Sequence, residues 1–286
     1  MEFAALTQTD IDSAADWMRE IPLRADRWRD NDTRSVIATE SGATIAAGIM
    51  WTTRVHGDRY WCEIAVAPGH RRRGVGRAVF DHLRTRRARD LGFMARGYVG
   101  DDHVAFARAL GAHTIQVVPP SAVAVAHRTL LSPHPSVASA AERSWGELAA
   151  HNAEVYAWTH AAWSPVGPGF ADALNADLID ELDVEASSVA IVRDRIVANC
   201  LVYRDSSRPV VTAETAAAST PDGERLVEGC VRRSLDVLAG RGITEAEFDG
   251  HVSDPHFLPV WTRLSPTGRW FHLLEIPAQR AAPFRT

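Results

Sequence analysis

Residues 61–78 read WCEIAVAPGHRRRGVGRA and carry the strongest structural signal in the chain. The apolar run that ends at Val66 predicts a strand, the segment around Pro68 predicts a loop, and a helix is expected to begin at Gly74 and Gly76. A helix N-terminus presents unpaired backbone N–H groups and the positive end of the helix dipole. The two glycines would let the backbone approach an anion closely, because no Cβ stands in the way. This stretch therefore predicts a site for a phosphorylated ligand.

The arginines around this loop fall into two groups. One group flanks the glycines and would add positive charge for a ligand with several phosphates: Arg71, Arg72, Arg73 and Arg77. The other group is expected to lie on a solvated helix face: Arg84, Arg86, Arg87 and Arg89. The loop is not a Walker loop, because no Gly-Lys-Ser/Thr follows, and it lacks the third glycine of a dinucleotide fingerprint.

The same order of predicted elements occurs twice along the chain. The first set comprises a helix after 9–12, a hairpin 35–39 and 44–53, strand 60–66, helix 74–91, strand 93–99, helix 102–110 and strands 114–118 and 123–126. The second set comprises helix 144–163, hairpin strands 189–192 and 196–203, strand 210–217, helix 226–238 and strands 244–248 and 270–275. A Ser-, Pro- and Ala-rich stretch separates them, which is typical of a linker. We therefore expect a first domain at 1–130, a linker at 131–142 and a second domain at 143–286.

The composition and net charge of the chain limit the classes of protein to which it can belong. The chain has 286 residues, of which 46% are hydrophobic and 23% charged, as in ordinary globular proteins of two domains. A net charge of −5 argues against a nucleic-acid partner, and all 31 basic residues are arginine. There is neither a signal peptide nor an apolar run of membrane-spanning length, which predicts a cytoplasmic protein without a membrane partner.

No metal site is predicted. Cys62, Cys200 and Cys230 are too widely spaced for a zinc knuckle or a disulfide framework. His251 and His256 are separated by Pro255, which prevents their presentation on one helix face.

The pattern Arg71-x-x-Gly74-x-Gly76 after Val66-x-Pro68 resembles motif A of the GNAT superfamily of N-acetyltransferases. The order of elements in residues 1–130 is similar to that family as well. The resemblance implies an α/β fold (α+β by some definitions) of two GNAT-like domains, each a mixed, mostly antiparallel twisted sheet flanked by helices. It also implies acetyl-CoA as co-substrate and direct transfer of the acetyl group to an amine in a ternary complex.

The resemblance also implies a cofactor site. Backbone groups of Ile64, Ala65 and Val66 would pair with the pantetheine arm, between strands 60–66 and 93–99 that splay apart. The amides from Arg71 to Arg77 would hold the pyrophosphate. The full set of implied cofactor residues is Ile64, Ala65, Val66, Arg71, Arg72, Arg73, Gly74, Val75, Gly76, Arg77 and Phe106.

The catalytic residues of the family are only partly present. The tyrosine that protonates the departing thiolate falls on Ala107, and the family's asparagine falls on Gly100. Glu63 is the first candidate for a general base, or else a structural carboxylate paired with an arginine. Tyr98 is the best replacement acid, or else an ordinary strand aromatic. Cys62 is expected to be a buried thiol, because no histidine base is identifiable near it.

The second domain is expected to be a degenerate copy without a cofactor site. The predicted alignment puts Gly74 on Arg225 and Gly76 on Val227, or on Leu226 and Glu228 after a shift of one residue. Either way both glycines are lost, and acidic neighbours would repel phosphate. We therefore expect an N-acetyltransferase with one acetyl-CoA site. A small-molecule amine, an aminoglycoside-like compound or a protein N-terminus would fit as acceptor, and the aromatic residues near the diverging strands favour a compact small molecule. The alternative is a non-catalytic acyl-CoA-binding or regulatory protein.

Overall fold

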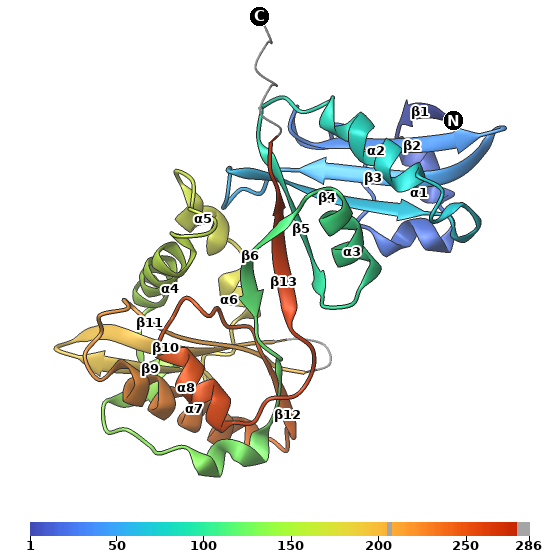
Figure 1. Ribbon diagram of the computed structural model, residues 1–286. Helices are drawn as coiled ribbons and strands as arrows, with labels where there is room; N and C mark the ends of the chain where they lie inside the picture. The colour runs from blue at the N-terminus through green and yellow to red at the C-terminus, as the bar shows by residue number, and fades with distance from the viewer. Residues whose placement is uncertain (205–207, 279–286) are drawn as a thin grey trace, which may run out of the picture. The chain divides into compact units, whose positions relative to one another are not determined.

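A computed structural model describes residues 1–204 and 208–278 (Figure 1). The chain divides into two compact units. Unit 1 comprises residues 1–114 together with the C-terminal residues from Leu273, and unit 2 comprises residues 115–272. The expectation of two α/β units with mixed sheets flanked by helices is confirmed.

Unit 1 is built on a seven-stranded sheet with the order β1-β2-β3-β4-β5-β13-β6. Strands β1 to β4 pair antiparallel, whereas β4 and β5 pair parallel. The strands are β1 (Glu2–Ala5), β2 (Arg34–Glu40), β3 (Ala43–Trp51), β4 (Arg59–Val66), β5 (Gly92–Tyr98), β6 (His113–Val118) and β13 (Phe271–Ile276).

Both faces of this sheet are covered. Helix α2 (Val75–Arg84) crosses β2, β3 and β4 (Figure 1), and its Val79, Phe80 and Leu83 are buried in a core that also takes in residues of α3 (Asp102–Ala109). The opposite face packs against the segment that contains α1 (Gln8–Asp12) and a 3-10 helix (Asp16–Glu20).

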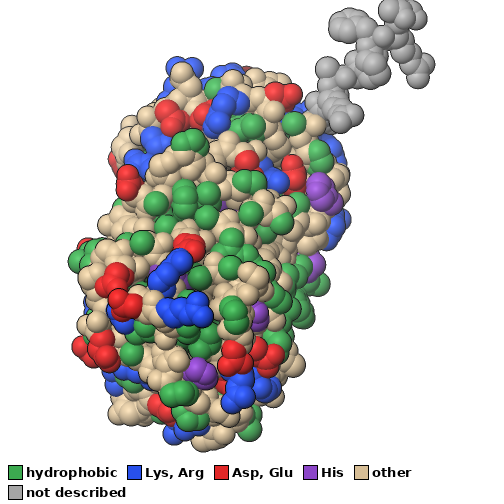
Figure 2. Space-filling model, turned by 90° about the vertical axis from the view of Figure 1, so that its left-hand side faces the viewer, with side chains coloured by type: hydrophobic (Ala, Val, Ile, Leu, Met, Phe, Trp, Pro, Cys, Tyr) green, Lys and Arg blue, Asp and Glu red, His purple; other side chains and the backbone are tan. Residues whose placement is uncertain are grey.

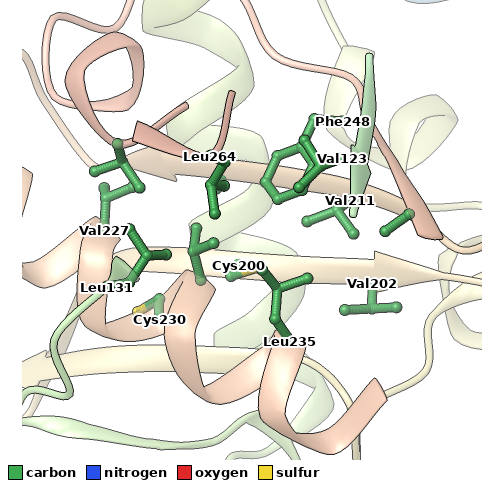
Figure 3. Packing of buried hydrophobic residues seen from close by; sticks show 14 of the residues in the cluster. Val123, Leu131, Cys200, Val202, Val211, Val227, Cys230, Leu235, Phe248 and Leu264 are labelled. Carbon is green, nitrogen blue, oxygen red and sulfur yellow. The ribbon is translucent and has the colours of Figure 1, made fainter. Parts of the chain in front are cut away.

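Unit 2 is built on a six-stranded sheet with the order β7-β12-β11-β10-β9-β8. Its strands are β7 (Ala122–Ala124), β8 (Val137–Ser139), β9 (Ser188–Val192), β10 (Arg195–Tyr203), β11 (Val210–Thr215) and β12 (Glu245–Phe248). Its helices are α4 (Trp145–His160), α5 (Phe170–Leu174), α6 (Leu178–Glu181), α7 (Gly223–Gly240) and α8 (Phe257–Arg263). Helix α7 packs Val227, Cys230 and Leu235 against β10 and β11, as Figure 3 shows. Helix α4 packs on the other face.

The strands cross the predicted domain boundaries. Strand β7 follows β6 in the chain but belongs to the sheet of unit 2, and β13 lies between β5 and β6 in the sheet of unit 1. The structure therefore divides the chain at 114/115 and 272/273, rather than around the predicted linker 131–142. That stretch contributes β8 to the second sheet and Leu131 to its core.

Two helix lengths also differ from the prediction. Helix α2 ends at Arg84 rather than at residue 91, and the backbone N–H groups of Ala88 and Arg89 donate to the Tyr60 hydroxyl at 3.1 Å. Helix α7 begins at Gly223 rather than at Leu226. No helix in the described ranges has the length and apolar character needed to cross a bilayer.

The arginines of α2 and the turn after it are largely neutralised by neighbouring carboxylates. Arg84 pairs with Asp81 at 3.1 Å, Arg87 with Asp90 at 3.0 Å and Arg89 with Asp32 at 2.9 Å. On the molecular face in Figure 2, basic and acidic side chains are interspersed rather than gathered by sign.

The insertion of β13 predicts that the core of unit 1 depends on a distant residue. Leu274 is fully buried in the cluster that holds Val79 and Phe93. We expect Leu274→Ala to destabilise unit 1 by about 2–5 kcal/mol, because it leaves a cavity in that core. Amide hydrogen exchange should show lost protection in β4 and α2.

The matched control is Leu130→Ala, since Leu130 is 57% exposed and should change stability little. Loss of protection confined to unit 2 in the Leu274 variant would contradict the assignment of β13 to the first sheet.

Candidate functional site

Strands β4 and β5 diverge toward their C-terminal ends. Their parallel register runs from Arg59–Gly92 through Tyr60–Phe93 to Trp61–Met94, and stops there. Strand β4 continues to Val66 with β3 as its neighbour on one side. The expected splaying of these two strands is therefore observed.

The divergence leaves specific backbone groups of β4 on an open edge. The Ala67 N–H donates to the Ile45 carbonyl at 2.9 Å, and the β3–β4 register is regular from there. Because backbone groups alternate sides along an antiparallel strand, those of Ile64 and Val66 face away from β3. Those of Ala65 face β3, and its side chain is buried in the core on the opposite face of the sheet from α2. Of the three residues predicted to pair with a pantetheine arm, Ala65 is therefore not available.

The loop after β4 presents a row of unused backbone donors. Within the described part of the chain, no protein acceptor is bonded to the backbone N–H of any residue from Arg72 through Arg77. Gly74 is the N-cap of α2 with φ of 83°, a left-handed conformation that favours glycine. Convergent N–H groups at a helix N-terminus form an anion site. The geometry fits the predicted phosphate loop.

Gly76 faces α3 and the end of β4 rather than open space. A Cβ at this position would lie 3.5 Å from the Phe106 ring and 3.6 Å from Val66, which is ordinary contact. The predicted cofactor residue Phe106 therefore lies directly beside the loop, on α3. A side chain longer than alanine at position 76 would press on Phe106 and Val66.

The arginine side chains of the loop are not all free for a ligand. The Arg71 Nε donates to the Val66 carbonyl at 2.9 Å, and its guanidinium pairs with Glu20 at 3.1 Å. Arg77 donates to the Ala109 carbonyl at 2.7 Å. Arg72 and Arg73 are exposed and bond to no other described residue. The structure thus leaves two guanidinium groups beside the open N–H groups.

Glu63 lies on the sheet face opposite α2, together with Trp61. The Trp61 ring stacks on Trp51 at 6.2 Å, and the Arg96 guanidinium lies 4.6 Å above it. The Glu63 side chain forms no ion pair or hydrogen bond with any residue in the described ranges. The structural alternative, a carboxylate paired with an arginine, does not hold.

Tyr98 ends β5 on the same face as Arg96, since side chains two apart share a face. Its backbone N–H donates to the Asp101 carboxylate at 3.2 Å, and its side chain is 38% exposed. The structure thus puts Glu63 and Tyr98 on one face of two diverging strands.

Two other residues near this site are unsuited to proton transfer or nucleophilic attack. Burial, reinforced by the neighbouring Glu63 carboxylate, raises the pKa of Cys62 to about 12, so its thiol stays protonated at neutral pH. Ala107 is buried in the core beneath α3 and offers no proton donor where the family has a tyrosine.

The corresponding loop of unit 2 aligns three residues earlier than predicted. Asp222 is the N-cap of α7 with φ of 56°, so it corresponds to Gly74, and Glu224 corresponds to Gly76. Val227, the predicted counterpart of Gly76, is fully buried in the core. The predicted alignment missed this register because Asp222, rather than a glycine, adopts the left-handed conformation at the start of α7.

Some backbone donors of this second loop are used internally. The N–H of Ala217 donates to the Thr220 hydroxyl, and the N–H groups of Thr220 and Gly223 donate to carbonyls of the loop. A Cβ on Gly223 would lie 2.7 Å from the His256 ring, so that ring covers the start of α7. Glu224 lies beside this start, where it pairs with Arg263 at 3.2 Å. The loop therefore offers an anion fewer open donors than the loop of unit 1, next to a carboxylate and a covering ring.

Unit 2 also brings together side chains that the sequence did not connect. Glu214 and His251 approach to 3.4 Å, and the His251 ring contacts those of His160 and Trp163. Glu214 aligns with Glu63 in the internal repeat, which is the one signal that pointed to it.

Comparison with known proteins agrees with this geometry. Residues 5–112 match the family model described as acetyltransferase (GNAT) family. No curated protein matches the sequence.

Solved structures share the fold at low sequence identity. A tandem GNAT protein from the clavulanic acid biosynthesis pathway aligns with a TM-score of 0.59 at 15% identity, over 98% of this chain and 99% of its own. A GCN5-related N-acetyltransferase from Sphaerobacter thermophilus aligns at 0.55 and 12%, over 87% and 82%. A glucosamine N-acetyltransferase region of a fungal multi-domain β-N-acetylglucosaminidase aligns at 0.59 and 16%, over 96% of this chain and 38% of that protein.

These likenesses establish the fold of both units, and the family match covers the loop and the diverging strands. Residues 5–112 match the acetyltransferase (GNAT) family, and the fold of the two units is similar to that of a tandem GNAT protein.

Proposed function

We propose that unit 1 transfers an acetyl group from acetyl-CoA to the amine of a small molecule. The observation that carries the proposal is the row of open N–H groups from Arg72 to Arg77 at the end of a strand that has parted from its neighbour. Backbone donors at a helix N-terminus suit a pyrophosphate, and Arg72 and Arg73 add positive charge. The backbone groups of Ile64 on the open edge suit an amide of a pantetheine arm. The Val66 carbonyl already accepts from Arg71, which leaves the Val66 N–H for the thioester oxygen.

The reaction needs a base, an oxyanion donor and an acid. The amine nitrogen attacks the thioester carbonyl carbon, an N–C bond forms and the C–S bond breaks. Glu63 takes the proton that the amine loses, because its carboxylate has no competing partner. The Val66 N–H, which faces the open edge, donates to the oxyanion. Tyr98 returns a proton to the departing sulfur in place of the absent family tyrosine.

Direct transfer is favoured over a covalent enzyme intermediate. The thiol nearest the site, Cys62, is held in its protonated form by burial. A protonated thiol is a poor nucleophile, and no base is bonded to it.

The alternative is an acyl-CoA-binding or regulatory protein without turnover. Ala107 favours it, because a buried methyl group replaces the usual acid. A panel of small amines assayed for CoA release separates the two functions, and we expect at least one amine to give steady turnover. Lysine is absent from the chain, so acetylation of its own side-chain amines contributes no background. Tight acetyl-CoA binding without CoA release across the panel would favour the alternative.

Binding stoichiometry tests the site assignment. Calorimetric titration is expected to give one acetyl-CoA per chain, because the second loop has fewer open donors and the His256 ring covers its helix start. Gly76→Glu should weaken binding about tenfold or more, since it adds a negative charge beside the open N–H groups and pushes on Phe106.

The matched control is Glu224→Gly at the corresponding position of unit 2. It should change neither affinity nor stoichiometry, because the His256 ring still covers the start of α7. Two equal sites, or loss of binding in the Glu224 variant, would mean that the wrong unit has been assigned.

Glu63 is tested by an isosteric change. Glu63→Gln should lower kcat about 10²-fold with nearly unchanged acetyl-CoA affinity, because it removes the base and preserves shape. Steady-state CoA release measures kcat, and calorimetry measures the affinity.

Tyr98→Phe is the companion variant. It should lower kcat for amines while leaving acetyl-CoA affinity intact. Full turnover in both variants would show that proton transfer runs through other groups.

A further inference from the structure

Unit 2 holds a cluster of polar side chains on the face of its sheet that packs against α4. Asn199 on β10 and Glu214 on β11 are directly opposite each other, so their side chains lie side by side on that face. His151 of α4 reaches Asn199, with 3.0 Å between its Nε2 and the Asn199 Nδ2. We call Asn199, Glu214, His151 and His251 the Glu214 cluster.

Two polar atoms of this cluster are left without a hydrogen bond. Asn199 is 2% exposed and His151 is 5% exposed, yet Asn199 Oδ1 and His151 Nδ1 have no partner. Turning the amide over leaves Asn199 Nδ2 unpaired instead, so one atom of the amide is orphaned in either orientation. A buried polar atom without a partner costs about 1–3 kcal/mol. The unpaired amide atom of Asn199, on the residue directly opposite Glu214, indicates a place where a ligand supplies the missing bond.

Glu214 is the buried carboxylate of the cluster. It is 8% exposed, and His251 at 3.4 Å is the one described residue that bonds to its side chain. Burial raises the pKa of Glu214, with His251 acting in the opposite direction, while the Asp254 and Asp249 carboxylates add to the rise. Burial lowers the pKa of His251, but its bond to Glu214 and the nearby Asp249 raise it overall. No arginine is bonded to Glu214 within the described ranges. With several carboxylates around one histidine, the cluster would attract a further cation.

Aromatic rings extend from the cluster. The His251 ring lies 4.6 Å from that of His160 and 5.6 Å from that of Trp163. The Tyr156 ring stacks on His160 at 3.8 Å. The faces of Tyr and Trp rings attract cations, so these side chains and the carboxylate favour the same class of ligand.

We propose that unit 2 binds a small primary ammonium ligand at the Glu214 cluster, with Glu214 as the charged anchor. The N–H groups of the ligand supply donors to Glu214 and to the unpaired Asn199 oxygen, which a quaternary ammonium cannot do. All the residues involved lie between His151 and His251, in the unit whose phosphate loop is closed. The site is separate from the proposed acetyl-CoA site and does not depend on turnover in unit 1.

The test uses the full chain in the absence of acetyl-CoA. Propylamine, tetramethylammonium and 1-propanol are titrated at pH 7.5, with binding followed by ligand-observed NMR and by tryptophan fluorescence. Propylamine should bind at one site at least tenfold more tightly than either of the other two. Equal binding of 1-propanol would overturn the role of charge, and equal binding of tetramethylammonium would overturn the role of N–H donors.

Two carboxylate variants locate the site. Glu214→Gln keeps the shape of the side chain and should weaken propylamine binding at least tenfold, whereas Glu185→Gln at an exposed position of unit 2 should leave it unchanged. Thermal unfolding checks that each variant is folded. Tyr156→Leu removes one ring face and should weaken binding severalfold. Propylamine binding that survives Glu214→Gln, or that is weakened as much by Glu185→Gln, would refute the proposal, as would no binding by the unaltered chain.

Discussion

The parting of β4 from β5 after Trp61–Met94 is the constraint on which the rest of unit 1 depends. A strand that loses its neighbour leaves N–H and C=O groups without partners, and such groups must be satisfied by something other than the sheet. In unit 1 the open edge at Ile64 and Val66 is followed, after a short bonded turn, by the open donors from Arg72 to Arg77. The Arg71 bond to the Val66 carbonyl ties the loop to the end of the strand. Two stretches of backbone are thereby kept available for the long, polyanionic ligand that we propose.

In unit 2 the backbone groups at the end of the corresponding strand bond to residues of the same unit. Strands β11 and β12 pair at Val210–Glu247 and Val211–Phe248 and then diverge as well. Here the Asp254 carboxylate accepts the Thr215 N–H at 2.7 Å, and His256 bonds to the Thr215 hydroxyl at 3.0 Å. A segment of the unit itself thus occupies the region that stays open in unit 1. Two copies of one fold thus differ in how their loops are satisfied, which is the basis of the different functions that we propose for them.

The local parts of this arrangement could be predicted from sequence. The strand, the loop and the helix start at Gly74 follow from short-range signals, and Gly74 has the left-handed conformation that glycine permits. The helix start at Gly223 was missed because Asp222 adopts that conformation without being glycine. Contacts between distant residues place β7 in the second sheet and β13 in the first. Such contacts also bring Glu214 to His251. Neither spacing nor composition encodes them, so only the three-dimensional structure reveals that Glu63 lacks an arginine partner while Glu214 has a histidine.

The position of β13 in the first sheet has a consequence for how the chain folds as it is made. Residues 1–118 leave the ribosome with β5 and β6 lacking the strand that lies between them. Residues 119–270 must follow before β13 emerges, which takes on the order of 10 s at about 5–20 residues per second. During that interval unit 2 can acquire its own core, whereas unit 1 waits with an open sheet edge. The unit that carries the proposed acetyl-CoA site is therefore first in sequence and last to be completed.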